Sequence, residues 1–180
     1  MLLVYAVPQS GAQARVTEGI GDVRTWYAGG NAYSNMGIRL ELWKGAALLI
    51  GERPLLGRSV PAARRQMEVL VARGSLDPVA LPAVHFHNDA LQALVTGGLV
   101  GLLAWLAILV APLAFFARMP RAPGSDSFAP AMAGMLVVSS FFCFGLTEVI
   151  FWTVRASLMY ALMVFLLMGL CLNTKEQDGK

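Results

Sequence analysis

The sequence has 180 residues, of which 57% are hydrophobic and only 14% are charged, and its mean hydropathy is +0.61. This composition departs from that of a soluble domain and indicates a membrane protein. The formal net charge of +3 is small, and no basic run is interleaved with aromatic residues, so the sequence argues against nucleic acid as a partner.

The chain opens with the apolar stretch MLLVYAV, residues 1–7, which is too short to cross a bilayer and lacks the features of a signal peptide. We interpret it as the end of a truncated transmembrane helix. Since no complete hydrophobic signal precedes residues 8–90, we expect the chain to be the carboxy-terminal part of a longer membrane protein.

A helix is expected within YSNMGIRLELWKGAALLIGERPLLG. Ser34 or Asn35 can cap its start, Gly51 can end it, and Pro54 prevents it from resuming. Within it, Glu41 and Lys44 have the i,i+3 spacing of an ion pair.

Arg39 is the charged residue on an otherwise apolar face of this helix. Helical spacing assigns to that face Trp43, Ala46, Ala47 and Ile50. One interpretation is that the aliphatic stem of Arg39 packs while its guanidinium reaches water or a carboxylate. The other is that Arg39 faces a cleft and binds an anion, because guanidinium matches phosphate in a bidentate manner.

More arginines follow, at positions 53, 58, 64, 65 and 73, the middle three near or within a short amphipathic helix, PAARRQMEVLVAR. Most are interpreted as a solvated or headgroup-facing surface. One or two can line an anion site, and we select Arg53 and Arg58 as candidate substrate-binding residues.

The two histidines of the chain lie together in HFHNDALQAL, and their spacing puts them on one face of an extended segment. Asp77 and Asp89 have no recognisable ligand spacing relative to His85 and His87, so no metal site is predicted. Neither a GxSxG elbow nor a cysteine with a nearby base is present, which excludes the common nucleophilic hydrolases.

Acid/base chemistry remains, because imidazole titrates near neutrality. Asn88 can cap the following helix or orient a histidine ring, and Asp89 falls in the first helical turn, where a negative charge favours the dipole. The alternative is that both histidines only anchor a helix end at the membrane interface.

Three apolar runs follow, at residues 91–117, 127–147 and 156–174, each near or above the roughly 20 residues that span a bilayer. They predict an all-α integral membrane protein with a three-helix transmembrane region at 91–174. The basic loop with Arg118 and Arg121 and the tail at 175–180 should be cytoplasmic, which places the helical segment 8–90 in the periplasm.

The stretches SNMGIRLELWKGAALLIGERPLLG and HFHNDALQALVTGGLVGLLAWL, in this order and spacing, resemble the carboxy-terminal half of the O-antigen ligase and polymerase superfamily. The resemblance runs from about Arg15 to the end of the third span. It implies a fragment of a larger polytopic, GT-C-like glycosyltransferase of the bacterial inner membrane. Members of the family have many more helices upstream, and a further periplasmic arginine expected there is not in this sequence.

The resemblance also implies a metal-independent reaction without cofactors, in which a glycan passes from an undecaprenyl-pyrophosphate carrier to a lipid A-core or other glycan acceptor. By the same resemblance, Arg39 contacts the diphosphate and His87, beside Asn88, is the general base, with His85 as second candidate. Partners are then the lipid-linked donor, the acceptor and membrane lipid.

Other functions stay open. An O-antigen polymerase or a protein O-oligosaccharyltransferase of the same superfamily would differ only in its acceptor. A catalytically inactive membrane fragment or a piece of a transporter would use Arg39 and the histidines as anchors. The three spans carry no ionisable residue at mid-span, which argues against transport.

Overall fold

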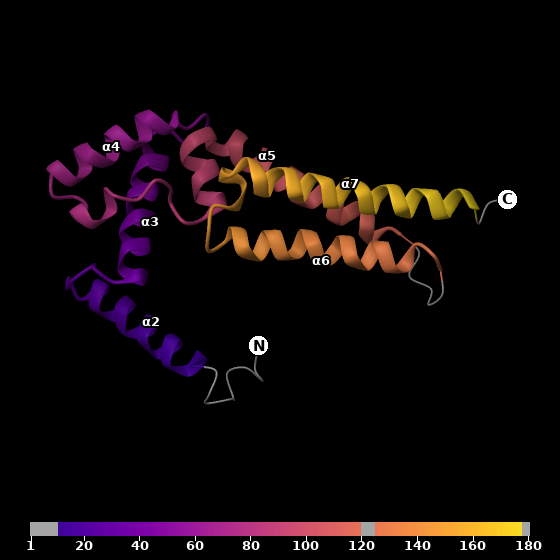
Figure 1. The fold of residues 1–180 in the computed structure, drawn as a ribbon. Helices are drawn as coiled ribbons and strands as arrows, with labels where there is room; N and C mark the ends of the chain where they lie inside the picture. The colour runs from indigo at the N-terminus through magenta and orange to yellow at the C-terminus, as the bar shows by residue number, and fades with distance from the viewer. Residues whose placement is uncertain (1–10, 120–124, 178–180) are drawn as a thin grey trace. The chain divides into compact units, whose positions relative to one another are not determined.

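The computed structural model describes residues 11–119 and 125–177, and these consist of helices and loops only (Figure 1). The all-α prediction is therefore confirmed, whereas the predicted end of a helix at residues 1–7 lies outside the described residues. The chain forms two compact units. The first contains the described residues up to Glu52 together with 60–84, and the second contains 53–59 and the described residues from His85 onward.

The first unit contains α2 (Ala12–Tyr27), α3 (Asn35–Glu52) and α4 (Val60–Ala72). The predicted start of α3 is confirmed, because the Ser34 hydroxyl accepts a hydrogen bond from the Gly37 N–H at 3.0 Å. The helix continues one residue past Gly51 and stops before Pro54, which cannot supply a backbone N–H.

The buried face of α3 differs from the apolar stripe expected around Arg39. Its buried residues are Gly37, Glu41, Leu42, Gly45, Ala46 and Leu49. A Cβ on Gly45 would lie 2.6 Å from the Met67 sulfur and 3.0 Å from Leu76, so this small residue lets α4 and the following loop approach. Ala46 is the one residue of the expected stripe that is buried, and Arg39 lies half-buried outside the buried face.

Glu41 joins three parts of the first unit although it is only 6% exposed. Its carboxylate accepts hydrogen bonds from the Trp26 indole N–H of α2 at 2.7 Å and from the Asp77 N–H at 3.0 Å. The predicted ion pair with Lys44 is confirmed at 3.8 Å. Because a buried carboxylate is stable only when it is paired, these contacts indicate that Glu41 holds α2, α3 and the loop at Asp77 together.

The second unit is built on three long helices that lie side by side, α5 (Asp89–Ala117), α6 (Phe128–Gly145) and α7 (Val154–Gln177) (Figure 1). Each is long and apolar enough to cross a membrane, so the three predicted spans are confirmed as candidate membrane helices. A buried cluster that includes Trp105, Phe116 and Tyr160 joins them. Large apolar side chains such as Leu162, 69% exposed, point outward, as expected of a surface that contacts lipid.

The first span is not the continuous helix that its uninterrupted apolar sequence suggests. Gly98 breaks α5, with φ 61° and ψ −154°, values that favour glycine. Segment 54–58 binds at this break. The N–H groups of Leu99 and Val100 donate to the carbonyls of Pro54 and Leu55 at 2.8 and 3.4 Å, while the Arg58 N–H donates to the Val95 carbonyl at 2.9 Å.

The turn PLLG therefore does more than end α3. Its backbone supplies the hydrogen-bond partners that the broken helix lacks. Without them, backbone N–H and carbonyl groups would be left unpaired in apolar surroundings, which is energetically costly. A Cβ on Gly57 would lie 2.6 Å from the Gly98 nitrogen, so both glycines are needed for the close approach. We call residues 54–58 the strap.

Candidate functional site

The loop before α5 holds the two histidines on either side of a buried residue. Phe86 is 6% exposed, and its N–H donates to the side-chain carbonyl of Gln92 at 3.3 Å. Asn88 caps α5 as predicted, since its side-chain oxygen accepts from the Leu91 N–H at 2.9 Å. The loop is thus fixed both in the core and at the helix start.

His87 has a backbone conformation that residues with a side chain rarely adopt. With φ 49°, it is the one non-glycine residue among those described with a positive φ. Such strain persists only where surrounding contacts enforce it, and it is common at functional sites.

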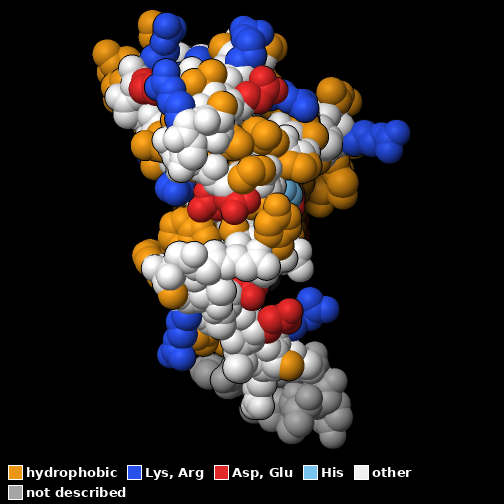
Figure 2. All heavy atoms as spheres, turned by 90° about the vertical axis from the view of Figure 1, so that its left-hand side faces the viewer, with side chains coloured by type: hydrophobic (Ala, Val, Ile, Leu, Met, Phe, Trp, Pro, Cys, Tyr) orange, Lys and Arg blue, Asp and Glu red, His pale blue; other side chains and the backbone are white. Residues whose placement is uncertain are grey.

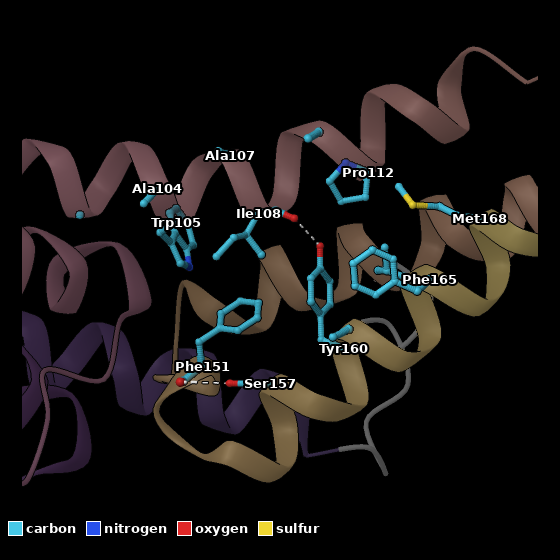
Figure 3. A pocket seen from close by; sticks show the side chains of 14 residues that line it. Ala104, Trp105, Ala107, Ile108, Pro112, Phe151, Ser157, Tyr160, Phe165 and Met168 are labelled. Atoms are coloured by element: carbon cyan, nitrogen blue, oxygen red, sulfur yellow. Dashed lines mark hydrogen bonds between the residues drawn. The ribbon is translucent and has the colours of Figure 1, made fainter.

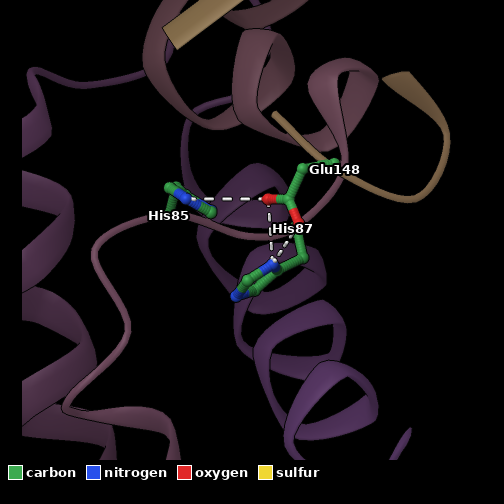
Figure 4. Close-up of side chains that lie close together, drawn as sticks. All are labelled: His85, His87 and Glu148. Atoms are coloured by element: carbon green, nitrogen blue, oxygen red, sulfur yellow. Dashed lines mark hydrogen bonds and ion pairs between the residues drawn. The ribbon is translucent and has the colours of Figure 1, made fainter. Parts of the chain in front are cut away.

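Glu148, in the loop between α6 and α7, joins both histidines (Figure 4). The Nδ1 of His87 lies 3.0 and 3.2 Å from the two carboxylate oxygens of Glu148. The Nε2 of His85 lies 3.7 Å from the same carboxylate, and the two imidazole rings stand edge to face with centroids 4.5 Å apart. Three side chains, from sequence positions up to 63 residues apart, therefore meet at one point.

Two neighbours of the histidines hold the Glu148 loop in place. The Asn88 side-chain amide donates to the Leu146 carbonyl at 2.9 Å. Asp89, 3% exposed, accepts hydrogen bonds from the N–H groups of Ile150 and Phe151 at 3.2 and 3.4 Å. Asp89 lies in the first turn of α5 as predicted, and its carboxylate additionally fastens the α6–α7 loop to this helix end.

The charges of the site influence one another. Burial lowers the pKa of His85, and the nearby His87 lowers it further against the opposing charge of Glu148. Burial by itself would raise the pKa of Glu148. The hydrogen bond from His87, the Val149 N–H and the charges of both imidazoles outweigh burial and lower this pKa below its ordinary value. Glu148 is consequently ionised at neutral pH.

This geometry sets the tautomer of His87. An ionised carboxylate can only accept hydrogen bonds, so the proton of a neutral His87 ring resides on Nδ1. The lone pair on Nε2 is then free to take a proton from a hydroxyl group. The arrangement of carboxylate, imidazole and free nitrogen is that of an oriented general base.

Glu148 was not predicted from the sequence as a partner of the histidines. Its position as a carboxylate in a short loop between two apolar helices is the feature of the sequence that could have marked it as a candidate site residue. The absence of a metal site was predicted from Asp77 and Asp89, whereas the third potential ligand beside the two histidines is Glu148.

The predicted substrate-binding arginines are distributed over both units. Arg39 belongs to the first unit. Arg53 directly precedes the strap and Arg58 is its last residue, and both belong to the second unit. Arg53 is exposed and Arg58 is half-buried. On the face shown in Figure 2, Lys and Arg side chains are scattered among apolar and acidic ones and form no single basic patch.

A large apolar groove lies between α5 and α7 (Figure 3). Its volume is about 780 Å³. Small residues of α5, including Gly101, Ala104 and Ala107, form one side. Two of its few polar groups are internally bonded, since the Tyr160 hydroxyl donates to the Ile108 carbonyl at 2.7 Å and the Ser157 hydroxyl to the Phe151 carbonyl at 3.3 Å, whereas the Trp105 indole N–H has no hydrogen-bond partner among the described residues. The groove therefore suits an apolar chain.

Comparison with known proteins identifies the class of this membrane protein. The family model described as O-antigen ligase matches residues 2–106, more than half of the chain and including Arg39, His85, His87 and Asn88. The chain belongs to the O-antigen ligase family, whose members are glycosyltransferase-like enzymes. Glu148 lies outside the matched residues.

A relative is an uncharacterized protein of Haemophilus influenzae, 23% identical over 138 residues. The match covers 76% of this chain and 35% of the relative, so the chain spans about a third of that protein's length.

Proposed function

We propose that the protein acts in the transfer of O-antigen glycan from undecaprenyl pyrophosphate to lipid A-core at the periplasmic face of the inner membrane. The observation that carries this proposal is the His87–Glu148 contact of 3.0 Å in a member of the O-antigen ligase family. A base oriented by a carboxylate is what activation of an acceptor hydroxyl requires.

In the proposed reaction, the acceptor hydroxyl attacks the anomeric carbon of the donor glycan. The new bond joins that carbon to the acceptor oxygen, the bond to the phosphate oxygen breaks, and the hydroxyl proton passes to Nε2 of His87. Glu148 keeps the proton on Nδ1 and stabilises the imidazolium that forms. The leaving group is undecaprenyl diphosphate, which departs as an anion, so no metal is needed to activate the nucleophile.

Arg39 is proposed to bind the diphosphate and to offset the negative charge that grows on it during bond cleavage. A half-buried guanidinium on α3 is suited to this role, because partial burial strengthens its interaction with an anion. Arg53 and Arg58 are further candidates for contacts to the donor, and Asn88 for contacts near the base.

The groove between α5 and α7 supports a lipid-linked donor. Its lining is almost entirely apolar, and Phe151, at one end of it, lies three residues after Glu148. We propose that the isoprenoid chain of the donor lies in this groove while its diphosphate approaches the end of the bundle that carries His87.

The test is complementation of a ligase-deficient bacterium with the gene, in wild-type form and with His87→Ala, His85→Ala or Arg39→Ala. Polymer-capped lipopolysaccharide is read on a gel, and the membrane level of each variant is measured by immunoblot. Arg64→Ala is the matched control for Arg39, because Arg64 is an exposed arginine of the same unit.

Loss of capping with His87→Ala and Arg39→Ala at normal protein level is the expected result. If His85→Ala abolishes capping and His87→Ala does not, His85 is the base. If the wild-type gene fails to restore capping, the acceptor is not lipid A-core, and the polymerase or protein-glycosylating reaction replaces the proposed one.

A further inference from the structure

His85, His87 and Glu148 direct three metal-ligating side chains toward one point in the second unit (Figure 4). One ligand atom from each lies within 4.8 Å of the others. Two imidazoles and one carboxylate are a donor set that zinc uses in proteins, with a fourth position left for water. We propose that these three side chains bind one Zn²⁺ ion.

The distances fit this ion. Zinc bonds to nitrogen and oxygen are about 2.0–2.2 Å long, so two ligand atoms of a tetrahedral site lie roughly 3.3–3.5 Å apart. The observed separations from a Glu148 oxygen are 3.0 Å to His87 Nδ1 and 3.7 Å to His85 Nε2. These values lie on either side of the required one, and all three ligand atoms lie within 4.8 Å of one another, so binding requires the side chains to move closer together by rotation.

The surroundings fit as well. The three side chains are 21%, 29% and 42% exposed, which lets an ion enter and leaves room for a water ligand. Both histidine backbones are held by the buried Phe86 and by the Asn88 cap, so little conformational freedom is lost on binding. Nitrogen ligands favour zinc over magnesium or calcium, which prefer oxygen.

A bound zinc ion would block the base, a consequence that rests on the proposed function. Zinc needs the lone pair of Nδ1, so the proton of the neutral His87 ring must move to Nε2. With Nε2 protonated, His87 cannot accept the proton of an acceptor hydroxyl. The site is therefore inhibitory, and the transfer itself proceeds without metal.

Binding is measured on the purified protein in detergent, carrying no histidine tag and freed of metal with a chelator. Zn²⁺ is titrated by calorimetry, and Co²⁺ is used as a spectroscopic probe of the ligands. We expect one equivalent to bind, and His85→Ala and Glu148→Gln each to weaken binding by at least about tenfold. Mg²⁺ should not compete.

Two variants serve as controls. Cys143→Ala removes the exposed thiol, and Glu68→Gln removes an exposed carboxylate of α4; neither should change zinc affinity. Circular dichroism and gel filtration establish that each variant is folded. The proposal is overturned if the wild type binds zinc no more tightly than a folded triple variant, His85→Ala, His87→Ala and Glu148→Gln, or if Cys143→Ala abolishes binding.

The transfer assay separates the two proposals. Zn²⁺ at saturating concentration should inhibit the wild type, and a chelator should restore activity. If zinc binds at these residues and transfer continues at the metal-free rate, the zinc site stands and the assignment of His87 as base is wrong.

Discussion

Glu148 should contribute to catalysis by orienting His87. Glu148→Gln removes the charge that fixes the Nδ1 proton and stabilises the imidazolium, while keeping the size of the side chain. We expect the transfer rate to fall by about 10- to 100-fold, less than the roughly 10²- to 10⁴-fold that a general base itself contributes, because His87 remains in place. The rate is measured with purified protein, lipid-linked donor and a chelator, so that no metal occupies the site.

The matched control is Glu68→Gln, since Glu68 is an exposed carboxylate paired only loosely, at 3.9 Å, with Arg64. A Glu148→Gln protein with the wild-type rate would remove Glu148 from the mechanism and leave His87 to act without a carboxylate partner.

At the level of single residues, the sequence predicted the part of the site that is local. His85, His87 and the Asn88 cap lie within four consecutive positions, and neighbouring positions are close in any fold. Glu148 is 61 positions from His87 and meets it only because the α6–α7 loop is fastened to the start of α5 by Asn88 and Asp89. Such a long-range contact depends on helix packing, which no local pattern encodes.

At the level of elements, the strap should be essential for the shape of α5. Gly98→Ala places a Cβ against the backbone of Leu55, which cannot rotate away, and forces alanine into a positive φ. We expect it to destabilise the protein by about 1–3 kcal/mol and to release the strap. Thermal unfolding in detergent measures the first effect, and faster trypsin cleavage after Arg58 measures the second.

Gly97→Ala is the control, because a Cβ at Gly97 meets no atom within 4 Å and alanine favours a helix. Equal stability and equal trypsin sensitivity of the two variants would show that the break in α5 does not depend on Gly98.

The helices themselves could be predicted, since capping residues, prolines and long apolar runs are local signals. The α5 break could not, because Gly97 and Gly98 stand in an uninterrupted apolar run and glycine alone is common in such helices. The strap stabilises the break, because the carbonyls of Pro54 and Leu55 accept the hydrogen bonds of Leu99 and Val100 in place of helix carbonyls. These partners are distant in the sequence, so no local pattern predicts the contact. Which α3 residues are buried could not be predicted from its apolar stripe either, because the burial of Glu41 and Gly45 depends on contacts with Trp26 and Met67, which are distant in the sequence.

At the level of the whole molecule, the proposed function requires the His87–Glu148 pair to face the periplasm. In a protein with Cys143 and Cys171 replaced by alanine, Thr147→Cys should react with a membrane-impermeant maleimide once the outer membrane is permeabilised. Arg118→Cys, at the exposed end of α5, should react only after lysis. The reverse labelling pattern would place the site in the cytoplasm and contradict a periplasmic transfer.

The groove between α5 and α7 should set the affinity for the lipid part of the donor. Ala107 lines the groove, so Ala107→Phe fills part of the space that the isoprenoid chain is proposed to occupy. We expect KM for the lipid-linked donor to rise about tenfold, equivalent to about 1.4 kcal/mol of lost binding, with a smaller change in kcat.

Val110→Phe adds a ring to the same helix at a position that is 55% exposed and is not part of the groove lining. Because it places a phenylalanine on the same helix outside the groove, it separates filling of the groove from a general effect of the aromatic ring on α5. If both variants raise KM equally, or neither does, the donor chain lies elsewhere. If only Ala107→Phe raises KM, the apolar tail and the reacting end of the donor are bound by the same three-helix unit that carries His87 and Glu148.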